Sequence, residues 1–217
     1  RAASTTRTDG PMTMSLRPLK IWVQLLLTIA AALCLVWVGV IVWEGRANRE
    51  AAIEQAGAYS LSLHQATMAG LTGMMVTGTI GQRAVFLDQV RQLNRVRDLR
   101  VVRGDAVNRV FGPGTAQEAA APDALEAEVL GSGQAVIRVE RAAGGEVLRA
   151  VRPATALRNH LGKDCVSCHQ VPENTVLGVV SIRMSLDEAD AAVAAMRTKS
   201  IIAAVVTCVP VLLLIYP

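Results

Sequence analysis

The sequence has few aromatic residues and no concentration of charge of one sign. Phe, Trp and Tyr make up only 3% of its 217 residues, so the hydrophobic fraction of 52% is mainly aliphatic. Residues 44–200 contain 18 Lys and Arg and 17 Asp and Glu, a net charge of +1. The rest of the overall charge of +4 lies in residues 1–20. Without a basic patch, we expect no nucleic-acid partner.

Cysteine is equally scarce, with four residues in the whole chain. This number excludes a small domain held together by several disulfides. Cys34 and Cys208 lie within apolar runs, where we interpret them as small hydrophobic residues. No nucleophile paired with a base stands out, so we do not expect an enzyme.

A long apolar run, Ile21–Trp43, contains 23 residues without a charged side chain. As a helix it is about 34 Å long, which exceeds the roughly 30 Å hydrocarbon core of a membrane. The core of a signal peptide is shorter, about 7–15 residues, and ends at a small-residue cleavage site. We therefore predict a retained transmembrane helix at residues 21–43.

A second apolar run, Ile201–Tyr216, has 16 apolar or neutral residues and contains Pro210. We predict a second transmembrane helix at residues 201–217, which is short enough to be truncated. A buried C-terminal helix is the alternative. Arg17 and Lys20 favour a cytoplasmic location for residues 1–20, because cytoplasmic flanks are rich in Lys and Arg.

Residues 44–200 have the pattern of one α+β domain. We predict helices at 44–78, 82–97 and 122–130, and another that begins at Asp187. Five predicted strands form an antiparallel sheet: 99–103, 107–111, 134–141, 146–151 and 176–184. The predicted fold is thus α+β, an antiparallel sheet with a long N-terminal helix, flanked by two transmembrane helices. Residues 1–15 have a disordered composition.

The motif that carries chemistry is Cys165-Val166-Ser167-Cys168-His169. This is the attachment pattern of c-type haem, in which two thiols form thioethers to one porphyrin and the histidine binds the iron. We therefore predict one covalent haem c, with Cys165 and Cys168 as its attachment points and His169 as the proximal iron ligand. Such haem is attached outside the cytoplasm, which predicts a bacterial inner-membrane protein whose main domain is periplasmic.

Two other interpretations of the motif remain open. A zinc site needs four ligands, and His160 and His169 would have to complete it because no second cysteine pair exists. A thioredoxin-like dithiol would make the trailing histidine incidental.

The distal side of the iron has three candidate ligands on the predicted helix 44–78: Met75 and Met68 first, then His64. They share one helix face, although a methionine on an apolar face is more often packed in a core. An open distal site would suit binding of a small gas. A run of arginines is a candidate partner for the haem propionates or an ordinary solvated face: Arg83, Arg91, Arg95, Arg97, Arg100 and Arg103.

Several separated segments together carry a family resemblance. They are Leu71–Thr79, Phe86–Gln89, Asp98–Gly104, Val110–Gly114 and Gly162–Pro172. In this order they resemble the periplasmic haem c sensor domains of bacterial methyl-accepting chemotaxis receptors. The resemblance implies a PAS-like or Cache-like fold, a homodimer, and a haem whose redox or ligand state is sensed for signal transduction. It also implies a distal methionine within Met68–Met75. The chain stops at Pro217, so we expect the cytoplasmic output half of such receptors to be lacking.

These observations leave three functional hypotheses. The first is a redox or gas sensor in which the haem changes helix packing and the membrane helices transmit the change. The second is a membrane-tethered cytochrome subunit that transfers electrons to a redox partner within a larger respiratory or photosynthetic complex. The third is a subunit whose haem mainly stabilises the fold.

Overall fold

The computed structural model describes residues 21–215 except residue 143, so the predictions for residues 1–20 lie outside the described part. The chain divides into two compact units. One contains the chain up to Trp43 and from Thr198 onward, and the other is Glu44–Arg197.

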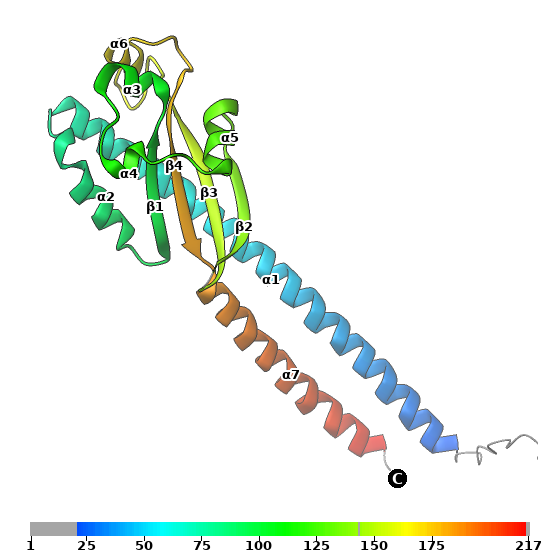
Figure 1. Cartoon of the computed structure of the whole chain (residues 1–217). Helices are drawn as coiled ribbons and strands as arrows, with labels where there is room; N and C mark the ends of the chain where they lie inside the picture. The colour runs from blue at the N-terminus through cyan, green and yellow to red at the C-terminus, as the bar shows by residue number, and fades with distance from the viewer. Residues whose placement is uncertain (1–20, 143, 216–217) are drawn as a thin grey trace, which may run out of the picture. The chain divides into compact units, whose positions relative to one another are not determined.

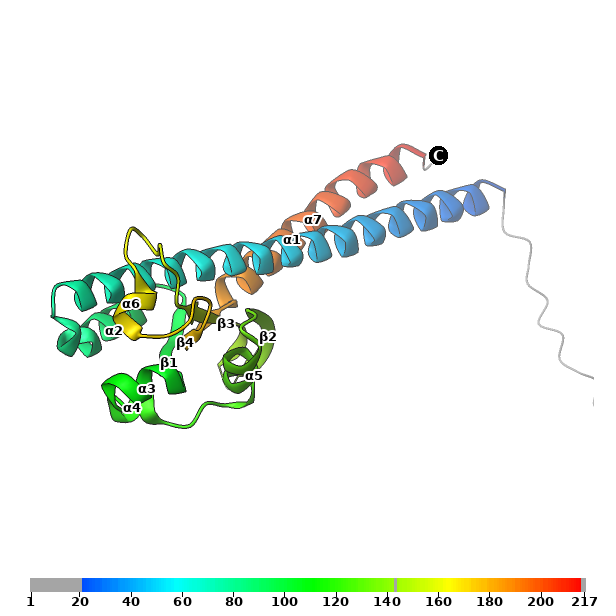
Figure 2. The ribbon, with the colours of Figure 1, turned by 90° about the horizontal axis from the view of Figure 1, so that it is seen from above.

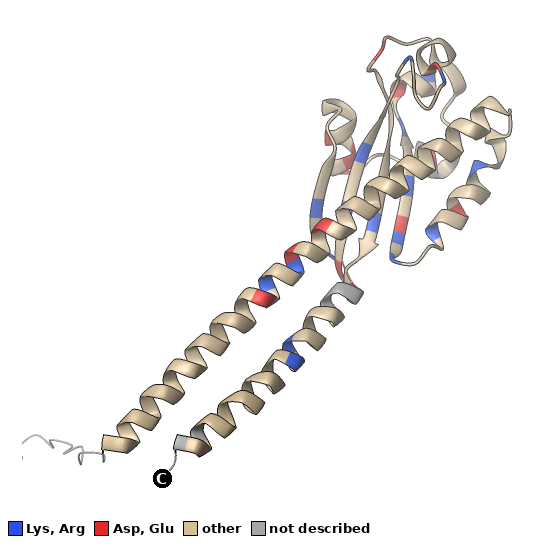
Figure 3. Cartoon of the chain, turned by 180° about the vertical axis from the view of Figure 1, so that it is seen from behind, with Lys and Arg blue, Asp and Glu red and all other residues tan. Residues whose placement is uncertain are grey.

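Two helices are long and apolar enough to cross a membrane by length and composition. The first, α1, is one uninterrupted helix of 56 residues, Ile21–Val76, and confirms the predicted long N-terminal helix. The second, α7, spans Asp187–Ile215 and contains Pro210. By sequence, α1 carries no charged residue before Glu44, and α7 carries none after Lys199. Figure 3 shows long stretches of both helices without a charged residue.

A four-stranded antiparallel sheet forms the centre of the Glu44–Arg197 unit (Figure 1). The strands are β1 (Val96–Arg103), β2 (Val136–Ala142), β3 (Gly145–Thr155) and β4 (Val176–Ser185), in the order β1-β4-β3-β2. The predicted α+β class and the hairpin of β2 and β3 are confirmed.

The central strands are buried on both faces, and each face has its own core. On one face, Leu148, Val180 and Ile182 pack with Leu63 of α1 and with residues of α2 (Arg83–Arg91). On the other face, Val151 of β3 packs with residues of α5, which spans Ala124–Ser132. Figure 2 shows α1 and α5 on opposite sides of the sheet. The alternation of side chains along a strand explains why neighbouring residues of β3 belong to different cores.

The prediction of a fifth strand at residues 107–111 was wrong. These residues belong to a short helix, α3 (Asp105–Phe111), which packs against β4. The N–H of Gly104 donates to the Leu177 carbonyl at 2.8 Å, and the helix begins directly after it. A Cβ atom at this position would lie 3.0 Å from that carbonyl oxygen, so the close approach requires glycine.

The helix predicted at 82–97 is also shorter in the structure. A 3-10 turn, η1 (Ile80–Gln82), leads into α2, which ends at Arg91. Arg95 adopts φ 70°, which interrupts helical geometry, and Val96 already pairs with Met184 of β4. One more short helix, α4 (Ala116–Ala119), was not predicted.

Candidate haem-attachment site

The Cys-Val-Ser-Cys-His motif forms a short helix, α6 (Cys165–His169), where the sequence predicts only a polar loop. Asp164 begins this helix, because its carboxylate accepts hydrogen bonds from Ser167 N at 3.1 Å and Ser167 Oγ at 2.6 Å. Gln170 ends it in the left-handed conformation, φ 53°. The helix follows β3 and precedes β4, and it packs against α3 at the end of the sheet where β4 begins (Figure 1).

The helical turn places both thiols on one side, because residues three apart are neighbours on a helix surface. Neither Cys165 nor Cys168 forms a disulfide, and their side chains are partly buried and exposed, respectively. Both sulfur atoms are therefore available to form bonds to an added group.

The His169 side chain, by contrast, is buried, with only 8% of the residue exposed. Its ring meets the ring of Phe111 edge to face, with centroids 5.4 Å apart and an interplanar angle of 80°. Burial lowers the pKa of His169, which favours the neutral imidazole. Its Nδ1 atom is buried and has no hydrogen-bond partner in the described structure. A neutral imidazole is the form that binds a metal ion.

Asn108, which the sequence did not single out, lies on α3, the helix that packs against α6. Its Oδ1 atom is buried without a hydrogen-bond partner in the part of the chain that the structure describes. Asn108 lies one helical turn before Phe111, so the two residues share a face of α3. The strand predicted here would have placed them on opposite faces, which is why sequence reasoning missed the pair.

The three candidate distal ligands lie on α1 in different surroundings. Met75 is 43% exposed, whereas Met68 is partly buried and packs against the core. His64 is partly buried, and its Nδ1 atom has no hydrogen-bond partner in the described chain. The burial and the nearby charges of Arg152 and His160 lower the pKa of His64 to about 4. Iron ligation by any of the three stays a prediction.

The arginines considered for the propionates are mainly used inside the fold. Arg83 and Arg103 share the buried carboxylate of Glu118, with N–O distances of 2.5 and 3.2 Å. Arg100 pairs with Glu126 at 3.2 Å. Burial alone would raise the pKa of Glu118, but the hydrogen bonds and charges of its partners outweigh burial and lower it. Arg83, Arg100 and Arg103 are therefore held in ion pairs within the fold, whereas Arg95 and Arg97 are exposed, as the interpretation of a solvated face predicts.

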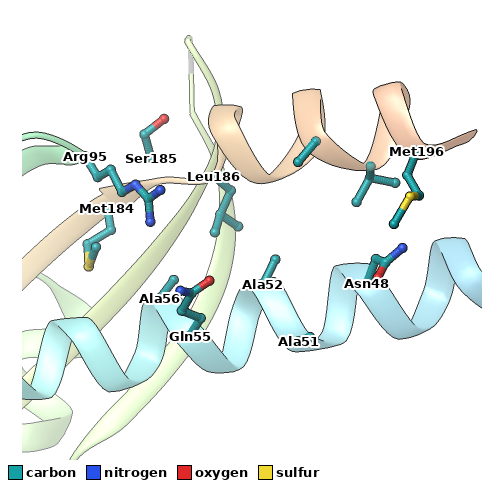
Figure 4. A pocket seen from close by; sticks show the side chains of 12 residues that line it. Asn48, Ala51, Ala52, Gln55, Ala56, Arg95, Met184, Ser185, Leu186 and Met196 are labelled. Carbon is teal, nitrogen blue, oxygen red and sulfur yellow. The ribbon is translucent and has the colours of Figure 1, made fainter. Parts of the chain in front are cut away.

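A cavity in the Glu44–Arg197 unit lies elsewhere. It has a volume of about 310 Å³ and lies between α1, the end of β4 and the start of α7 (Figure 4). Asn48, Gln55, Arg95 and Met196 are among its lining residues. No residue of α6 lines this cavity, so any group attached to the thiols would lie outside it.

Among the described residues, no group of three His, Cys, Asp or Glu side chains is placed to hold a metal ion. A haem iron does not need such a group, because the porphyrin supplies four nitrogen ligands and the protein only one or two. No model of a known protein family matches the sequence, and no curated protein matches it closely enough to serve as a relative.

Proposed function

We propose that this chain is a membrane-anchored c-type haem protein that acts as a redox or gas sensor. The observation that carries the proposal is the composition of α6: two free thiols on one helical turn, followed by a buried neutral imidazole. Cys165 and Cys168 would hold one haem through thioether bonds, and His169 would bind its iron. When bound, this group supplies reversible one-electron chemistry and a site for a small gas.

The surroundings of His169 fit this assignment. Nδ1 is buried without a partner, so the ring can keep its proton on that atom and leave Nε2 as a metal ligand. Phe111 restricts the rotation of the ring through the edge-to-face contact. Asn108 lies on the same face of α3 and offers an unpaired buried oxygen. We assign it the role of orienting the imidazole.

For the distal ligand we favour Met75. Its thioether is exposed and is not needed in the core, whereas Met68 packs against the core and would leave a void on moving. A methionine ligand raises the reduction potential of a haem relative to a second histidine.

The two apolar helices and the motif together support a location in the bacterial inner membrane. Haem c is attached outside the cytoplasm, so residues 44–200 would be periplasmic and residues 1–20 cytoplasmic. The segments at 21–43 and 201–217 would cross the membrane. The continuity of α1 supports the sensor role, because one helix extends from the apolar segment to the core of the sheet. A PAS-like or Cache-like homodimer would be the signalling unit.

Electron transfer within a larger membrane complex is the second candidate. The exposure of the Cys168 side chain favours it, because a haem attached there would have an edge near the surface. A redox partner must then exchange electrons with the purified protein at a useful rate, and a sensor has no such requirement.

An absorption spectrum of the reduced full-length protein, with and without CO or NO, tests the proposal. We expect a c-type spectrum, and a bound gas if the distal side opens on reduction. Met75→Ala should convert a six-coordinate spectrum to a five-coordinate or water-bound one. Met74→Ala, one residue away on a different side of α1, is the matched control. An unchanged spectrum in both Met75→Ala and Met68→Ala would exclude a methionine ligand.

A further inference from the structure

Arg152 on β3 is a partly buried cation without a carboxylate. It pairs across the sheet with Val180 and lies on the same face as Leu148, the face covered by α1. Its Nε atom is buried without a hydrogen-bond partner, and its guanidinium forms no ion pair with any described residue. Only this nitrogen of the guanidinium is among the buried atoms without a partner, so the group keeps access to water while it has no acceptor in the described chain.

Two histidines from other parts of the chain also carry a buried nitrogen without a partner, and His64 lies one turn from the buried Ser60 and Thr67, on the face of α1 that packs against the sheet. His64 comes from α1, next to Leu63, whose side chain packs in the core that contains Val180. His160 comes from the loop between β3 and α6, where its backbone pairs with Lys163. The buried Nδ1 of His64 and the buried Nε2 of His160 both lack hydrogen-bond partners in the described chain.

The electrostatics of His64 agree with a position near Arg152 and His160. Burial lowers the pKa of His64 most, followed by the charge of Arg152 and then that of His160. No carboxylate is among the groups that affect it. Burial also lowers the pKa of Arg152. Among the described residues, then, no acidic side chain acts on His64 or Arg152, and the charges that reach His64 are those of Arg152 and His160.

We propose that Arg152, His64 and His160 form a binding site for a small carboxylate or oxyanion. An anion would supply the acceptor oxygens that the three side chains lack, and a planar carboxylate matches the two-pronged guanidinium. His64 then has an anion-binding role and is not an iron ligand.

Two sources can provide the carboxylate. One is a propionate of the haem attached to α6, which follows His160 by five residues; this source rests on the proposed function. The other is a free anion from the surroundings, which requires no haem. Both have the same chemistry, and attachment of the haem should compete with the free anion only if a propionate is the occupant.

The test uses the full-length chain in detergent, as the wild type with haem and as the haem-free double variant Cys165→Ala/Cys168→Ala. The probes are sodium acetate and sodium phosphate, titrated at constant ionic strength against sodium chloride. We expect either probe to raise the thermal midpoint of the haem-free chain. Arg152→Met should weaken this binding about tenfold or more, since a charge-assisted hydrogen bond is lost. The control Arg158→Met removes an exposed arginine from the loop that contains His160. It should leave the binding of acetate and phosphate unchanged.

The haem-containing chain identifies the source. A propionate occupies the site if two results are found together. Acetate does not change the thermal midpoint of the haem-containing chain, and its reduction potential changes in Arg152→Met but not in Arg158→Met. If acetate stabilises both forms, the occupant is a free anion. Should the double variant fail to fold, the potentials of the two arginine variants and the acetate titration of the wild type decide. No effect of any probe on either form, together with an unchanged potential in Arg152→Met, overturns the proposal. Covalent attachment is read separately by mass, so a chain without haem refutes the proposed function while the acetate titration still tests the site.

Discussion

Two arginines of β3, three residues apart, meet opposite electrostatic environments. Arg149 faces α5 and is 5% exposed; its guanidinium contacts Asp123, Glu126 at 3.4 Å and Glu140 at 3.7 Å. It also donates to Ser181 Oγ at 3.3 Å. Arg152 faces α1 and has no ion pair in the described chain. The odd spacing along a strand puts them on different faces of the sheet.

This difference in ion pairing gives the two arginines different roles. The charge of Arg149 stabilises the fold, and the charge of Arg152 is available to a ligand. On the α5 face, Glu126 comes from the helix, Glu140 from β2 and Asp123 from the cap of α5, where it accepts hydrogen bonds from Leu125 N and Glu126 N. The same carboxylate pairs with Arg149, so the start of the helix and the sheet hold each other in place. On the α1 face, Arg152 acts electrostatically on a histidine, His64, whereas on the α5 face Arg149 pairs with acids. The Nε atoms of both arginines are buried without a hydrogen-bond partner, so the two side chains differ in their ion pairs: Arg149 has carboxylate partners, and Arg152 has none among the described residues.

We expect the largest loss of stability when the ion pairs of Arg149 on the α5 face are removed. Arg149→Met leaves Asp123, Glu126 and Glu140 without their shared cation, and we expect a loss of about 3–5 kcal/mol in the free energy of unfolding. Urea unfolding at neutral pH, followed by circular dichroism, measures it. Arg138→Met on neighbouring β2 is the control, because Arg138 pairs with Glu128 at 3.4 Å on the surface and should cost at most about 1 kcal/mol. Equal losses in the two variants would refute the contrast.

Low pH should weaken another set of buried ion pairs, those of Glu118 with Arg83 and Arg103. The folded-state pKa of Glu118 lies below its ordinary value of 4.5, so its contribution to stability is complete above about pH 4.5. That contribution is lost as the pH falls toward the lower folded-state pKa. We expect Glu118→Gln to cost about 2 kcal/mol at neutral pH and to flatten the acid side of the stability curve. The unfolding midpoints of the wild type and of Glu118→Gln are measured from pH 7 downward at constant salt. Parallel curves for the two proteins would show that Glu118 does not contribute to the loss of stability in acid.

The stability of the fold should change little when Arg152, on the α1 face, is replaced in the same way as Arg149. In the haem-free chain without added anions, Arg152→Met should change the free energy of unfolding by no more than about 0.5 kcal/mol, because no partner loses a bond. The same unfolding experiment as for Arg149→Met provides the comparison. A loss as large as that of Arg149→Met would show that Arg152 has a structural partner and would remove the contrast between the two faces.

Much of this arrangement could be predicted from the sequence, and the exceptions have physical causes. The hairpin of β2 and β3 and the strand β4 follow from alternating apolar residues and a Gly-Gly turn. The segment 107–111 has strand-forming residues, but β1 lies at the edge of the sheet and the chain leaves it at Gly104 to form α3. Local propensity cannot report that choice, because it depends on the contacts of α3 with β4 and α6.

The site divides in the same way. Cys165, Cys168 and His169 are adjacent in sequence, so their spacing alone predicts their chemistry. Asn108 and Arg152 acquire their significance only from tertiary structure, since the absence of a hydrogen-bond partner is not visible in a sequence. The ion pairs of Arg83, Arg100 and Arg103 are likewise formed with acids 15 to 35 residues away.

The smallest expected effect concerns Asn108. Asn108→Leu keeps the approximate volume of the side chain and removes its polar atoms, so it should leave haem attachment intact. We expect a shifted reduction potential and an altered iron–histidine stretching frequency, because the orientation of His169 is no longer held. Val107→Leu, its neighbour on α3, serves as the control. Identical spectra and potentials in the two variants would show that Asn108 has only a packing role.

The mass of the purified full-length chain, expressed together with the machinery for c-type haem attachment, tests the central claim most directly. We expect the mass of the polypeptide plus one haem, its loss in Cys165→Ala/Cys168→Ala, and a covalent haem with changed iron coordination in His169→Ala. A wild-type chain with the mass of the bare polypeptide and two titratable thiols would contradict the assignment of α6 as a haem-attachment site.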